Sequence, residues 1–477
     1  MRALVALSLI GCGGKDLGTV PDKPTDTAPP PVTDTDDIAA PWLSGGCSAQ
    51  DDNALRYNCV FNLSAQDSLQ LSLDGPGRDQ LYASDAVTDR HELTLYLLTP
   101  STEFTWIASA GGHQLAGTLT TGPLPPDVDI VADVTGVGTA DTIVVPFQCG
   151  APGHLVAVDE RGQVEWYQNM TRNLGDGLNG INIDGFDASA ESLIGLLGHA
   201  GIAEYAWEGE QLGSALVGQD YDKPTHHSVF RRDGQRFVLN ADDYVEPDGT
   251  YVMDGIYVFD ADWNVVDEWA LRDILAPSGG GAPGGYWGSV FPGAVDYSHS
   301  NGIYVGDTSE WIVSMRGLHT VIGVQGASAA PDFGSLQWAL TTSGFSPFTT
   351  DYLVTSSNGA TADPSFSDQH HAHIEDDGGL WLFDNGNFGQ DSRALRMTLR
   401  DDYDVADIDQ VFQLDELCAV QSSVYLLPNA HVLVTCAGTQ TIYEFDGASP
   451  EPIWEVKLSC AQGGNAPLMV RGQPIFW

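Results

Sequence analysis

Basic side chains are scarce in this sequence. Its 477 residues include 19 Lys and Arg against 65 Asp and Glu, which gives a formal net charge of -46. Only four residues are lysine, at positions 15, 23, 223 and 457. Binding to a nucleic-acid backbone requires a basic surface, so this charge excludes nucleic acid as a partner. An acidic surface of this kind keeps a protein solvated.

Long apolar runs and helical periodicity are also missing. No segment offers the roughly 18 uninterrupted apolar residues of a membrane-spanning helix. From about residue 126 onward, apolar residues almost never recur with the spacing of an amphipathic helix. Short alternating runs separated by turn residues occur instead, and they predict an all-β protein.

The N-terminus has the order of a secretion signal. Arg2 precedes the apolar run 3–10, and Leu9-Ile10-Gly11-Cys12 resembles a bacterial lipobox. We therefore expect residues 1–12 to be a lipoprotein signal and Cys12 to be lipidated; an ordinary signal that contains a cysteine is the alternative. A lipid chain would anchor the protein to a membrane without a spanning helix. Gly13, rather than Asp, predicts that the exported protein resides at the bacterial outer membrane, periplasmic or surface-exposed.

The remaining cysteines predict disulfides. The sequence has seven cysteines, and an even number is left once Cys12 is set aside. None of them forms a C-x-x-C pair, which argues against a zinc site. The plausible pairs are Cys47 with Cys59, Cys418 with Cys436, and Cys149 with Cys460. The last pair requires that the two ends of a closed ring meet.

Composition divides the chain into four parts. After the signal, residues 13–41 are rich in Pro, Thr and Asp and predict a disordered tether. Residues 42–125 alternate apolar and polar positions, which predicts a small β-sandwich. The end of that segment, 117–125, resembles the last strand of a fibronectin type III or immunoglobulin-like module. Residues 126–477 form the fourth part.

A strand-turn-strand element recurs six times in 126–477, and its second run often ends in tryptophan. The copies begin at Leu155, Ile202, Ile256, Val321, Leu395 and Ile442. Each copy would expose a face that only its neighbours can bury, as in the blades of a propeller. The repeat therefore predicts a six-bladed β-propeller.

Two further copies of a different element begin with histidine. His226 and His370 each lie eight residues before a turn glycine that leads into an apolar strand. Equal spacing predicts that these two histidines lie at the same depth in two blades and face the axis. The neighbouring His227 also qualifies, and the sequence leaves open which of the pair points inward.

Clustered histidines allow two kinds of chemistry. They could coordinate a metal together with Asp296, or they could act on an anion. Arg316 ends an apolar strand 17 residues after His299. A guanidinium would repel a metal ion but would clamp a sulfate or phosphate, so we expect an anion site without a metal or other cofactor.

Five segments carry a resemblance to a known family. Asp296–Asn301 resembles a D-x-x-H-x-N motif, and Ser314–Arg316 resembles the Ser-x-Arg strand end that follows it. Gln369–Ala372 and Phe383–Gly386 resemble a Q-H-D-A to F-D-N-G pair, and Thr225–Ser228 resembles an H-H-D segment. With the strand repeats, the chain from about residue 45 to 477 resembles the bacterial arylsulfate sulfotransferases.

This resemblance implies a six-bladed propeller that moves a sulfuryl group from an aryl sulfate to a phenol without a nucleotide donor. It implies that His370 is the nucleophile and forms a sulfohistidine, while His299, Arg316 and one of His226 and His227 hold the sulfuryl oxygens. Three polar residues are the expected substrate contacts, namely Asn301, Asp384 and Asn385.

Two residues depart from the family pattern, since His371 and Ser228 stand where carboxylates are expected. A catalytically degenerate, surface-anchored propeller that binds an anionic or aromatic ligand is therefore the alternative function. A metal-dependent hydrolase is a third hypothesis. The sequence leaves the oligomeric state open.

Overall fold

The structure is a computed structural model of a protein made of strands. It describes residues 42–477 except 77–79, 148, 150–152, 179–180, 280–284, 308, 345, 357–363, 376–377, 387–390, 401–403 and 463–468. The predicted signal, the lipidation site Cys12 and the tether 13–41 lie outside the described residues. The described residues from Trp42 to Trp477 form one compact unit.

Five short 3-10 helices accompany the strands. They are η1 (Pro126–Val128), η2 (Asp176–Leu178), η3 (Leu271–Asp273), η4 (Gly285–Trp287) and η5 (Arg316–Leu318). No helix in the described part of the chain is long and apolar enough to span a membrane.

The N-terminal strands belong to a single sheet. They are β1 (Leu43–Gln50), β2 (Asn53–Asp74), β3 (Gln80–Leu95), β4 (Glu103–Ala110) and β5 (His113–Thr120). The long β2 pairs with β1 along its first part and with β4 at its end, while β3 pairs along its other edge. Alternate apolar residues of these strands, among them Phe61, Leu71 and Trp106, bury one shared core.

Six further sheets follow in the described residues. The first contains β32 (Gln473–Ile475), β7 (Thr142–Pro146), β8 (His154–Val158) and β9 (Val164–Asn169). The second contains β10 (Ile183–Ala188), β11 (Ser192–Leu197), β12 (Gly201–Ala206) and β13 (Gln211–Leu216). The third contains β14 (Thr225–Arg232), β15 (Gln235–Glu246), β16 (Gly249–Phe259), β17 (Val265–Ala270) and β18 (Val295–Asp296).

The other three sheets come from the C-terminal half. The fourth contains β19 (Ser300–Val305), β20 (Glu310–Met315), β21 (Thr320–Gln325) and β22 (Leu336–Thr341). The fifth contains β24 (His370–Ile374), β25 (Gly379–Asp384), β26 (Arg393–Leu399), β27 (Val405–Gln413) and β23 (Leu353–Ser356). The sixth contains β28 (Ser423–Leu426), β29 (Val432–Cys436), β30 (Thr441–Phe445), β31 (Trp454–Cys460) and β6 (Ile130–Gly136).

Each predicted strand-turn-strand repeat falls on two neighbouring strands of one of these sheets. The repeat at Leu155 is β8 and β9, for example, and the repeat at Ile442 is β30 and β31. The tryptophans at the repeat ends, such as Trp166 and Trp454, are buried. They fill the space between sheets, as the apolar pattern predicts.

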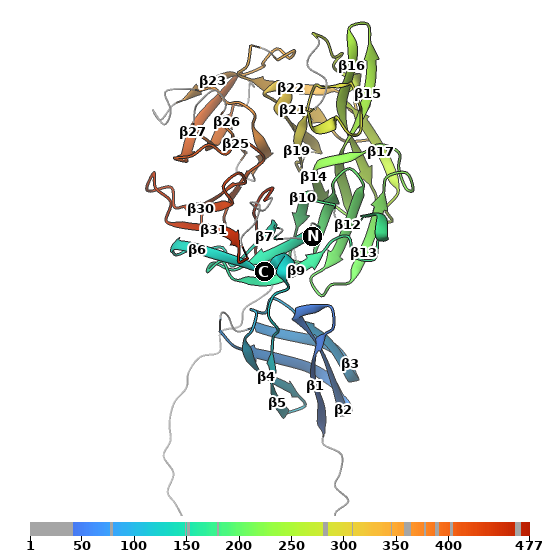
Figure 1. Ribbon diagram of the computed structural model, residues 1–477, viewed down its shortest axis with the longest axis vertical. Helices are drawn as coiled ribbons and strands as arrows, with labels where there is room; N and C mark the ends of the chain where they lie inside the picture. Colours follow the sequence, from blue (N-terminus) through green and yellow to red (C-terminus); the bar gives the residue numbers. More distant parts are fainter. Residues whose placement is uncertain are drawn as a thin grey trace, which may run out of the picture. The chain divides into compact units, whose positions relative to one another are not determined.

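The six sheets form a closed ring. One edge strand of each sheet contacts the corresponding strand of the next, and we call these six the innermost strands: β32, β10, β14, β19, β24 and β28. β32 contacts β10 on one side and β28 on the other, which completes the circuit. Figure 1 looks onto this ring, in which the sheets follow one another from green through yellow to red.

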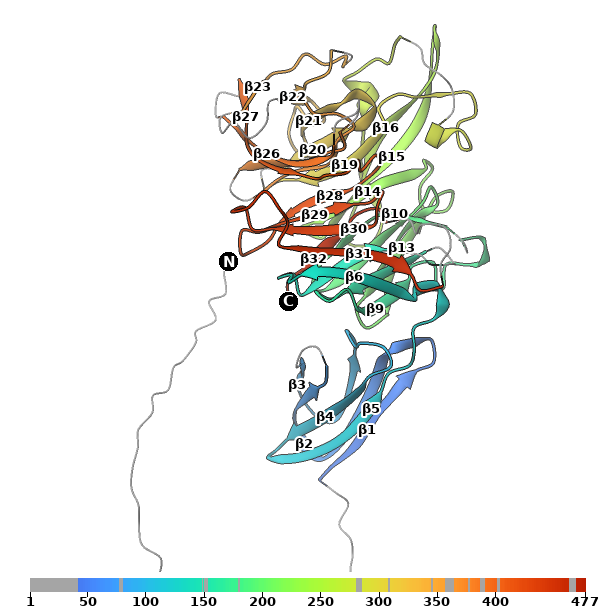
Figure 2. The same cartoon turned by 60° about the vertical axis from the view of Figure 1, so that its left-hand side comes forward.

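Both ends of the ring-forming segment close it. β6 adds to the last sheet by antiparallel pairing with β31, and β32 adds to the first sheet by pairing with β7. Figure 2 shows β6 beside β31. A disulfide between Cys149 and Cys460 links the same two regions, as the sequence predicts. The other two predicted disulfides, Cys47–Cys59 and Cys418–Cys436, are also present.

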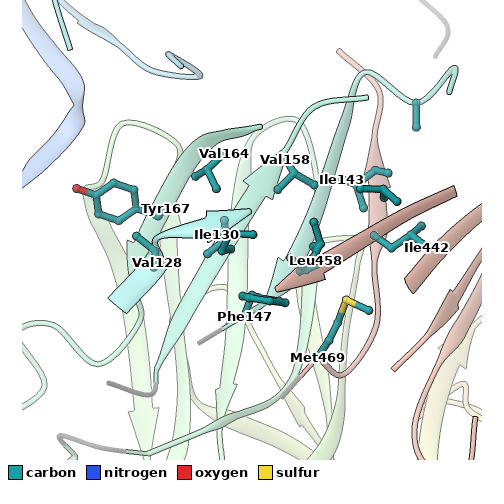
Figure 3. Packing of buried hydrophobic residues seen from close by; sticks show 14 of the residues in the cluster. Val128, Ile130, Ile143, Phe147, Val158, Val164, Tyr167, Ile442, Leu458 and Met469 are labelled. Atoms are coloured by element: carbon teal, nitrogen blue, oxygen red, sulfur yellow. The ribbon is translucent and has the colours of Figure 1, made fainter. Parts of the chain in front are cut away.

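A buried cluster lies behind this closure. It combines Ile143 and Val158 of the first sheet with Ile442 and Leu458 of the last (Figure 3). Phe147 is fully buried among them. Burial of apolar surface contributes about 25 cal/mol per Å2, so this cluster stabilises the contact between the two ends.

Candidate active site

Four described histidines share an uncommon backbone conformation, and three of them lie at the innermost strands. His227, His299 and His371 have positive φ values of 54°, 45° and 54°. Each lies in or directly before an innermost strand, where the strand register shifts. Such bulges turn side chains away from the regular alternation, and positive φ costs about 1–3 kcal/mol for a residue other than glycine. Backbone strain of this kind is concentrated at functional sites.

His370 is held in one tautomer. Its Nδ1 lies 2.9 Å from the carbonyl oxygen of Asp368 and 2.7 Å from Oδ1 of Asn385. Both partners are acceptors, so Nδ1 carries the proton and Nε2 carries the lone pair. No group among the described residues forms a hydrogen bond to Nε2. The imidazole therefore presents an unengaged nucleophilic nitrogen.

Asn385 is itself oriented by the backbone. Its Nδ2 donates to the carbonyl oxygens of Cys418, at 2.5 Å, and Gln421, at 3.0 Å. The amide cannot turn around without losing both bonds, so Oδ1 faces His370. The disulfide Cys418–Cys436 ties the connection that supplies one of these carbonyls to the end of β29.

Burial keeps His370 neutral. The pKa of His370 is lowered to about 3, and desolvation is the largest cause. The hydrogen bond to Asn385 raises this pKa, while the charges of Arg316 and His299 lower it. An imidazole with this pKa is uncharged at neutral pH, which is the form that attacks an electrophile.

His227, rather than His226, lies beside His299. The ring centroids of His227 and His299 are 4.8 Å apart. Desolvation, followed by the charges of His299, His226 and His370, holds the pKa of His227 well below its ordinary value. The prediction that His226 faces the axis at the depth of His370 is therefore wrong, because the bulge in β14 exchanges the two neighbouring side chains.

His226 forms the support behind His227. The two Nδ1 atoms are 3.0 Å apart, so one proton is shared between the rings. Nε2 of His226 lies 3.3 Å from the carbonyl oxygen of Asn240 and 3.1 Å from Oδ1 of Asp254. Asp254 is buried, which by itself raises its pKa. His226 and three hydrogen bonds have the opposite effect and outweigh burial, so the pKa of Asp254 is lowered. A chain of polar groups thus leads from His227 to a buried carboxylate.

His299 has its own carboxylate partner. Its Nδ1 lies 2.6 Å from Oδ2 of Asp296. A carboxylate accepts, so Nδ1 of His299 carries a proton and its Nε2 is the atom left for the site. Asp296, which the metal hypothesis would use as a ligand, thus orients a histidine.

Arg316 approaches from the turn after β20. Its backbone N–H donates to the carbonyl oxygen of His299 at 3.0 Å, so the two residues share one corner. Nη2 lies 3.8 Å from Oδ2 of Asp368, a loose ion pair, and 31% of the side chain is exposed. Its charge is one of the causes that lower the pKa of His370.

The predicted substrate contacts occupy different positions. Asp384 is buried in an ion pair with Arg393, with 2.9 Å between Oδ2 and Nε. Asn385 orients His370, as described. Nδ2 of Asn301 donates to the carbonyl oxygen of Gln369 at 2.7 Å, and its Oδ1 is buried without a hydrogen bond. Of the three, Asn301 has an unused polar atom.

Tyr286 is a site residue that sequence reasoning missed. Its ring centroid lies 4.6 Å from that of His227 and 5.6 Å from that of His299. Its hydroxyl donates to Oδ2 of Asp184 at 2.6 Å, and burial raises its pKa, so it stays protonated. The ring also packs on His199, at 4.9 Å. Tyr286 lies in a connection outside the strand repeat, and only that departure from the repeat could have drawn attention to it.

The two departures from the family pattern do not touch the His370 ring. The ring of His371 lies 4.4 Å from that of Tyr425, on another part of the axis. Oγ of Ser228 accepts the backbone N–H of Ile303 at 3.3 Å.

A metal site requires several His, Cys, Asp or Glu ligand atoms that lie close together. Within the described ranges, the one group of three or more potential ligands that gathers closely is Glu416 with Cys418 and Cys436. Those two cysteines form a disulfide. The donor atoms of the histidine cluster do not converge in this way.

Comparison with known proteins identifies the family. A family model described as Arylsulfotransferase (ASST) matches residues 131–406, more than half of the chain. The chain belongs to the arylsulfotransferase family. The matched range includes the predicted site residues from His226 to Asn385. No curated protein matches the chain.

Solved structures similar to this arylsulfotransferase are distant in sequence. A protein of unknown function from Bacteroides caccae is 11% identical with a TM-score of 0.42, over 70% of this chain and 98% of that one. Virginiamycin B lyase from Staphylococcus aureus is 10% identical with a TM-score of 0.37, over 70% of this chain and 90% of that one. The description of the ring rests on the sheets themselves.

Proposed function

We propose that the protein transfers a sulfuryl group from an aryl sulfate to a phenol through a sulfohistidine on Nε2 of His370. The observation that carries this proposal is the tautomer of His370, in which two acceptors hold Nδ1 and leave the Nε2 lone pair free. Family membership supports sulfuryl transfer as the reaction class.

In the first half-reaction, Nε2 of His370 attacks the sulfur of the aryl sulfate. An N–S bond forms while the S–O bond to the aryl group breaks, and the phenolate leaves with the electron pair. Arg316 donates hydrogen bonds to the sulfuryl oxygens, over which negative charge is spread in the transition state. His299 donates to the same oxygens from Nε2 as an imidazolium whose Nδ1 is held by Asp296. Fixed donors in a site with little water contribute most to catalysis of this kind.

We assign the proton transfers to His227 and its partners. A proton on Nε2 of His227 goes to the leaving phenolate, and Nδ1 of His227 takes the shared proton from His226. In the second half-reaction the acceptor phenol returns a proton to Nε2 while its oxygen attacks sulfur and the N–S bond breaks. The buried Asp254 carboxylate, 3.1 Å from His226, balances the positive charge whenever His226 holds the extra proton.

Tyr286 supplies an aromatic wall for the aryl group. Its ring already packs on His227 and His299, and its hydroxyl is occupied by Asp184. Aromatic rings prefer offset or edge contacts with other rings, so an aryl sulfate or phenol would lie against this surface.

Incubation with a chromogenic aryl sulfate, with and without phenol, tests the proposal. We expect phenol-dependent release of the chromophore, and denaturation at alkaline pH without acceptor, which preserves an N–S bond, should leave one SO3 group on the peptide that contains His370. Absence of both results would reject the activity. Retained binding of aryl sulfate without turnover would instead support the alternative, a catalytically degenerate binding protein.

Two further predictions concern the rest of the chain. We propose that the six sheets are six blades of a β-propeller and that the N-terminal sheet is a separate β-sandwich module. We also propose export and anchoring through Cys12, on the sequence of the signal alone. Mass spectrometry of the mature N-terminus tests the anchor, since an unmodified Cys12 would exclude it.

A further inference from the structure

A cavity, which we call the axial cavity, lies on the axis of the ring next to the histidine cluster. Its volume is about 150 Å3. All six innermost strands contribute to its lining, through Asp187, Phe230, Tyr304, His373, Tyr425 and Gln473. His371, the residue after the nucleophile, also lines it. The proposed sulfuryl transfer uses none of these residues.

Arg471 supplies a positive charge to this cavity. Its guanidinium carbon lies 5.1 Å over the ring of Phe186. Its Nε is buried without a hydrogen bond, and no carboxylate among the described residues pairs with it. In a chain with a net charge of -46, a cation that lines a cavity without a carboxylate partner is exceptional. Burial of an unpaired charge is unfavourable, so this arrangement is suited to an anionic ligand.

Two neutral donors lie near Arg471. The backbone N–H of Val424 donates to Nδ1 of His371 at 3.4 Å, which leaves the proton of that ring on Nε2. Burial, followed by His373 and Arg471, holds the pKa of His371 well below its ordinary value, so the ring is neutral. Burial also raises the pKa of Tyr425, so its hydroxyl stays protonated. No hydrogen bond within the described chain uses that hydroxyl or Nε2 of His371.

The carboxylates of the cavity are already paired. Oδ2 of Asp187 accepts from Nε of Arg231 at 2.9 Å, and its Oδ1 accepts from Nε2 of Gln473 at 3.2 Å. Oε1 of Glu375 lies 3.1 Å from Nε2 of His373. Arg231 offsets the charge of Asp187, and His373 engages Glu375 through a hydrogen-bond contact, so both carboxylates have partners other than Arg471.

We propose that the axial cavity is a binding site for a small, fully deprotonated tetrahedral oxyanion such as sulfate. Arg471, Nε2 of His371 and the Tyr425 hydroxyl can each donate a hydrogen bond, and sulfate offers only acceptors. A cavity of about 150 Å3 has room for roughly five waters, or for one oxyanion with one or two waters. It is smaller than the roughly 300 Å3 of pockets for drug-sized ligands, which favours a small ligand.

Selenate, an anomalous scatterer with the shape of sulfate, tests this site directly. We expect crystals of the wild-type protein grown with selenate to show an anomalous peak within hydrogen-bonding distance of Arg471. Arg471→Gln should lose this peak, whereas Arg316→Gln should keep it, because Arg316 belongs to the histidine cluster. Absence of the peak in the wild type, or its persistence in Arg471→Gln, would overturn the proposal.

Titration calorimetry with sodium sulfate measures the affinity. We expect Arg471→Gln to weaken binding about tenfold or more and Tyr425→Phe to weaken it a few-fold, since charged hydrogen bonds contribute more than neutral ones. Phosphate should bind more weakly than sulfate at neutral pH, because its proton finds no unpaired carboxylate. Tighter binding of phosphate would contradict the assignment of sulfate.

Aryl sulfate turnover of the Arg471→Gln variant distinguishes sulfate binding in the axial cavity from the proposed sulfuryl transfer. Arg471→Gln should keep its aryl sulfate turnover within about threefold of wild type and should lose only the sulfate site. A thermal melt without sulfate checks that the variant is folded. Loss of the selenate peak in a folded, active variant supports the axial site whether or not His370 is the nucleophile.

Discussion

Strands β14 and β24 each contain a pair of adjacent histidines near their start and use them in opposite ways. In β24 the first histidine, His370, is the anchored ring with a free Nε2, and the second turns to the axial cavity. In β14 the second histidine, His227, lies beside His299, and the first is buried behind it against Asp254.

The size of the bulge explains the difference. In β24, His370 pairs with Phe383 of β25, and the next paired residue, His373, pairs with Trp381. β24 therefore covers three positions where β25 covers two, so it contains one inserted residue. In β14, Thr225 pairs with Asn240 of β15, and the next paired residue, Val229, pairs with Val238. β14 covers four positions where β15 covers two, so it contains two inserted residues. β14 therefore contains one more inserted residue than β24. Since side chains alternate between the faces of a strand, one residue exchanges the inward and outward positions.

Removing the first histidine of each strand should give the largest contrast. His370→Ala should lower kcat about 10³-fold or more, because the proposed nucleophile is lost. His226→Ala should lower it by only about 10- to 100-fold, because His227 keeps its place and loses its proton partner. Steady-state turnover of a chromogenic aryl sulfate measures both.

The neighbouring His371→Ala serves as the control for His370→Ala. It changes the same strand but a different cavity, so turnover should stay within about tenfold of wild type. Equal loss in His226→Ala and His370→Ala would contradict the different roles given to the two strands.

Asn385→Asp should convert the anchor of His370 into a charged partner. A carboxylate stabilises the imidazolium, so the pKa of His370 should rise from about 3 toward neutrality. Because the imidazolium has no free electron pair, activity should fall by about 10²-fold at pH 6 and recover as the pH rises. The wild type should show no His370-dependent loss above about pH 5, and pH profiles of kcat compare the two.

Two glycines on β10 and β19, the innermost strands on either side of β14, provide a matched test of the β14 bulge. A Cβ at Gly185 would lie 2.2 Å from the carbonyl oxygen of His227, whereas a Cβ at Gly302 would lie 3.5 Å from the nearest atom, the backbone N of His371. Gly185→Ala must therefore displace His227, and we expect about tenfold lower turnover and about 1–3 kcal/mol lower unfolding free energy.

Gly302→Ala meets only an ordinary contact and should stay close to wild type in both measurements. Similar losses in the two variants would show that the close approach to His227 has no special effect.

The smallest effect is a dependence of stability on pH. His370 and His227 are neutral in the folded protein, because burial lowers the pKa of both, while the unfolded chain protonates near pH 6.5. Stability is therefore full above about pH 6.5 and falls as the pH drops toward the folded pKa. Each histidine contributes a slope of at most about 1.4 kcal/mol per pH unit.

Urea unfolding at pH 7.5 and 5.5 measures this slope. His370→Asn and His227→Asn should each make the slope shallower than in the wild type. An unchanged slope in either variant would mean that the histidine is protonated in the folded state.

Local patterns in the sequence predicted much of the architecture. The six strand repeats lie on adjacent strands because alternating apolar runs that end in tryptophan must bury one face, a constraint that each repeat carries by itself. Cys149 and Cys460 were paired correctly because a ring has to join its ends.

The site was less predictable for physical reasons. Spacing from His226 to its turn glycine counts residues but does not reveal how many of them a bulge absorbs. Tyr286 lies in a connection that no repeat constrains, and its place beside His227 depends on the packing of two sheets. Asp254 reaches His226 across a strand pair, which a linear pattern does not report.

Closure by both chain ends has a consequence for the order in which the ring is assembled. Arg471 lies two residues before β32, so the axial cavity gains its charge only when that strand pairs with β7. The proposed catalytic histidines come from consecutive sheets in the middle of the chain and can gather earlier. An oxyanion beside Arg471 would therefore stabilise the closed ring, since a ligand that binds only the closed ring favours that state by mass action.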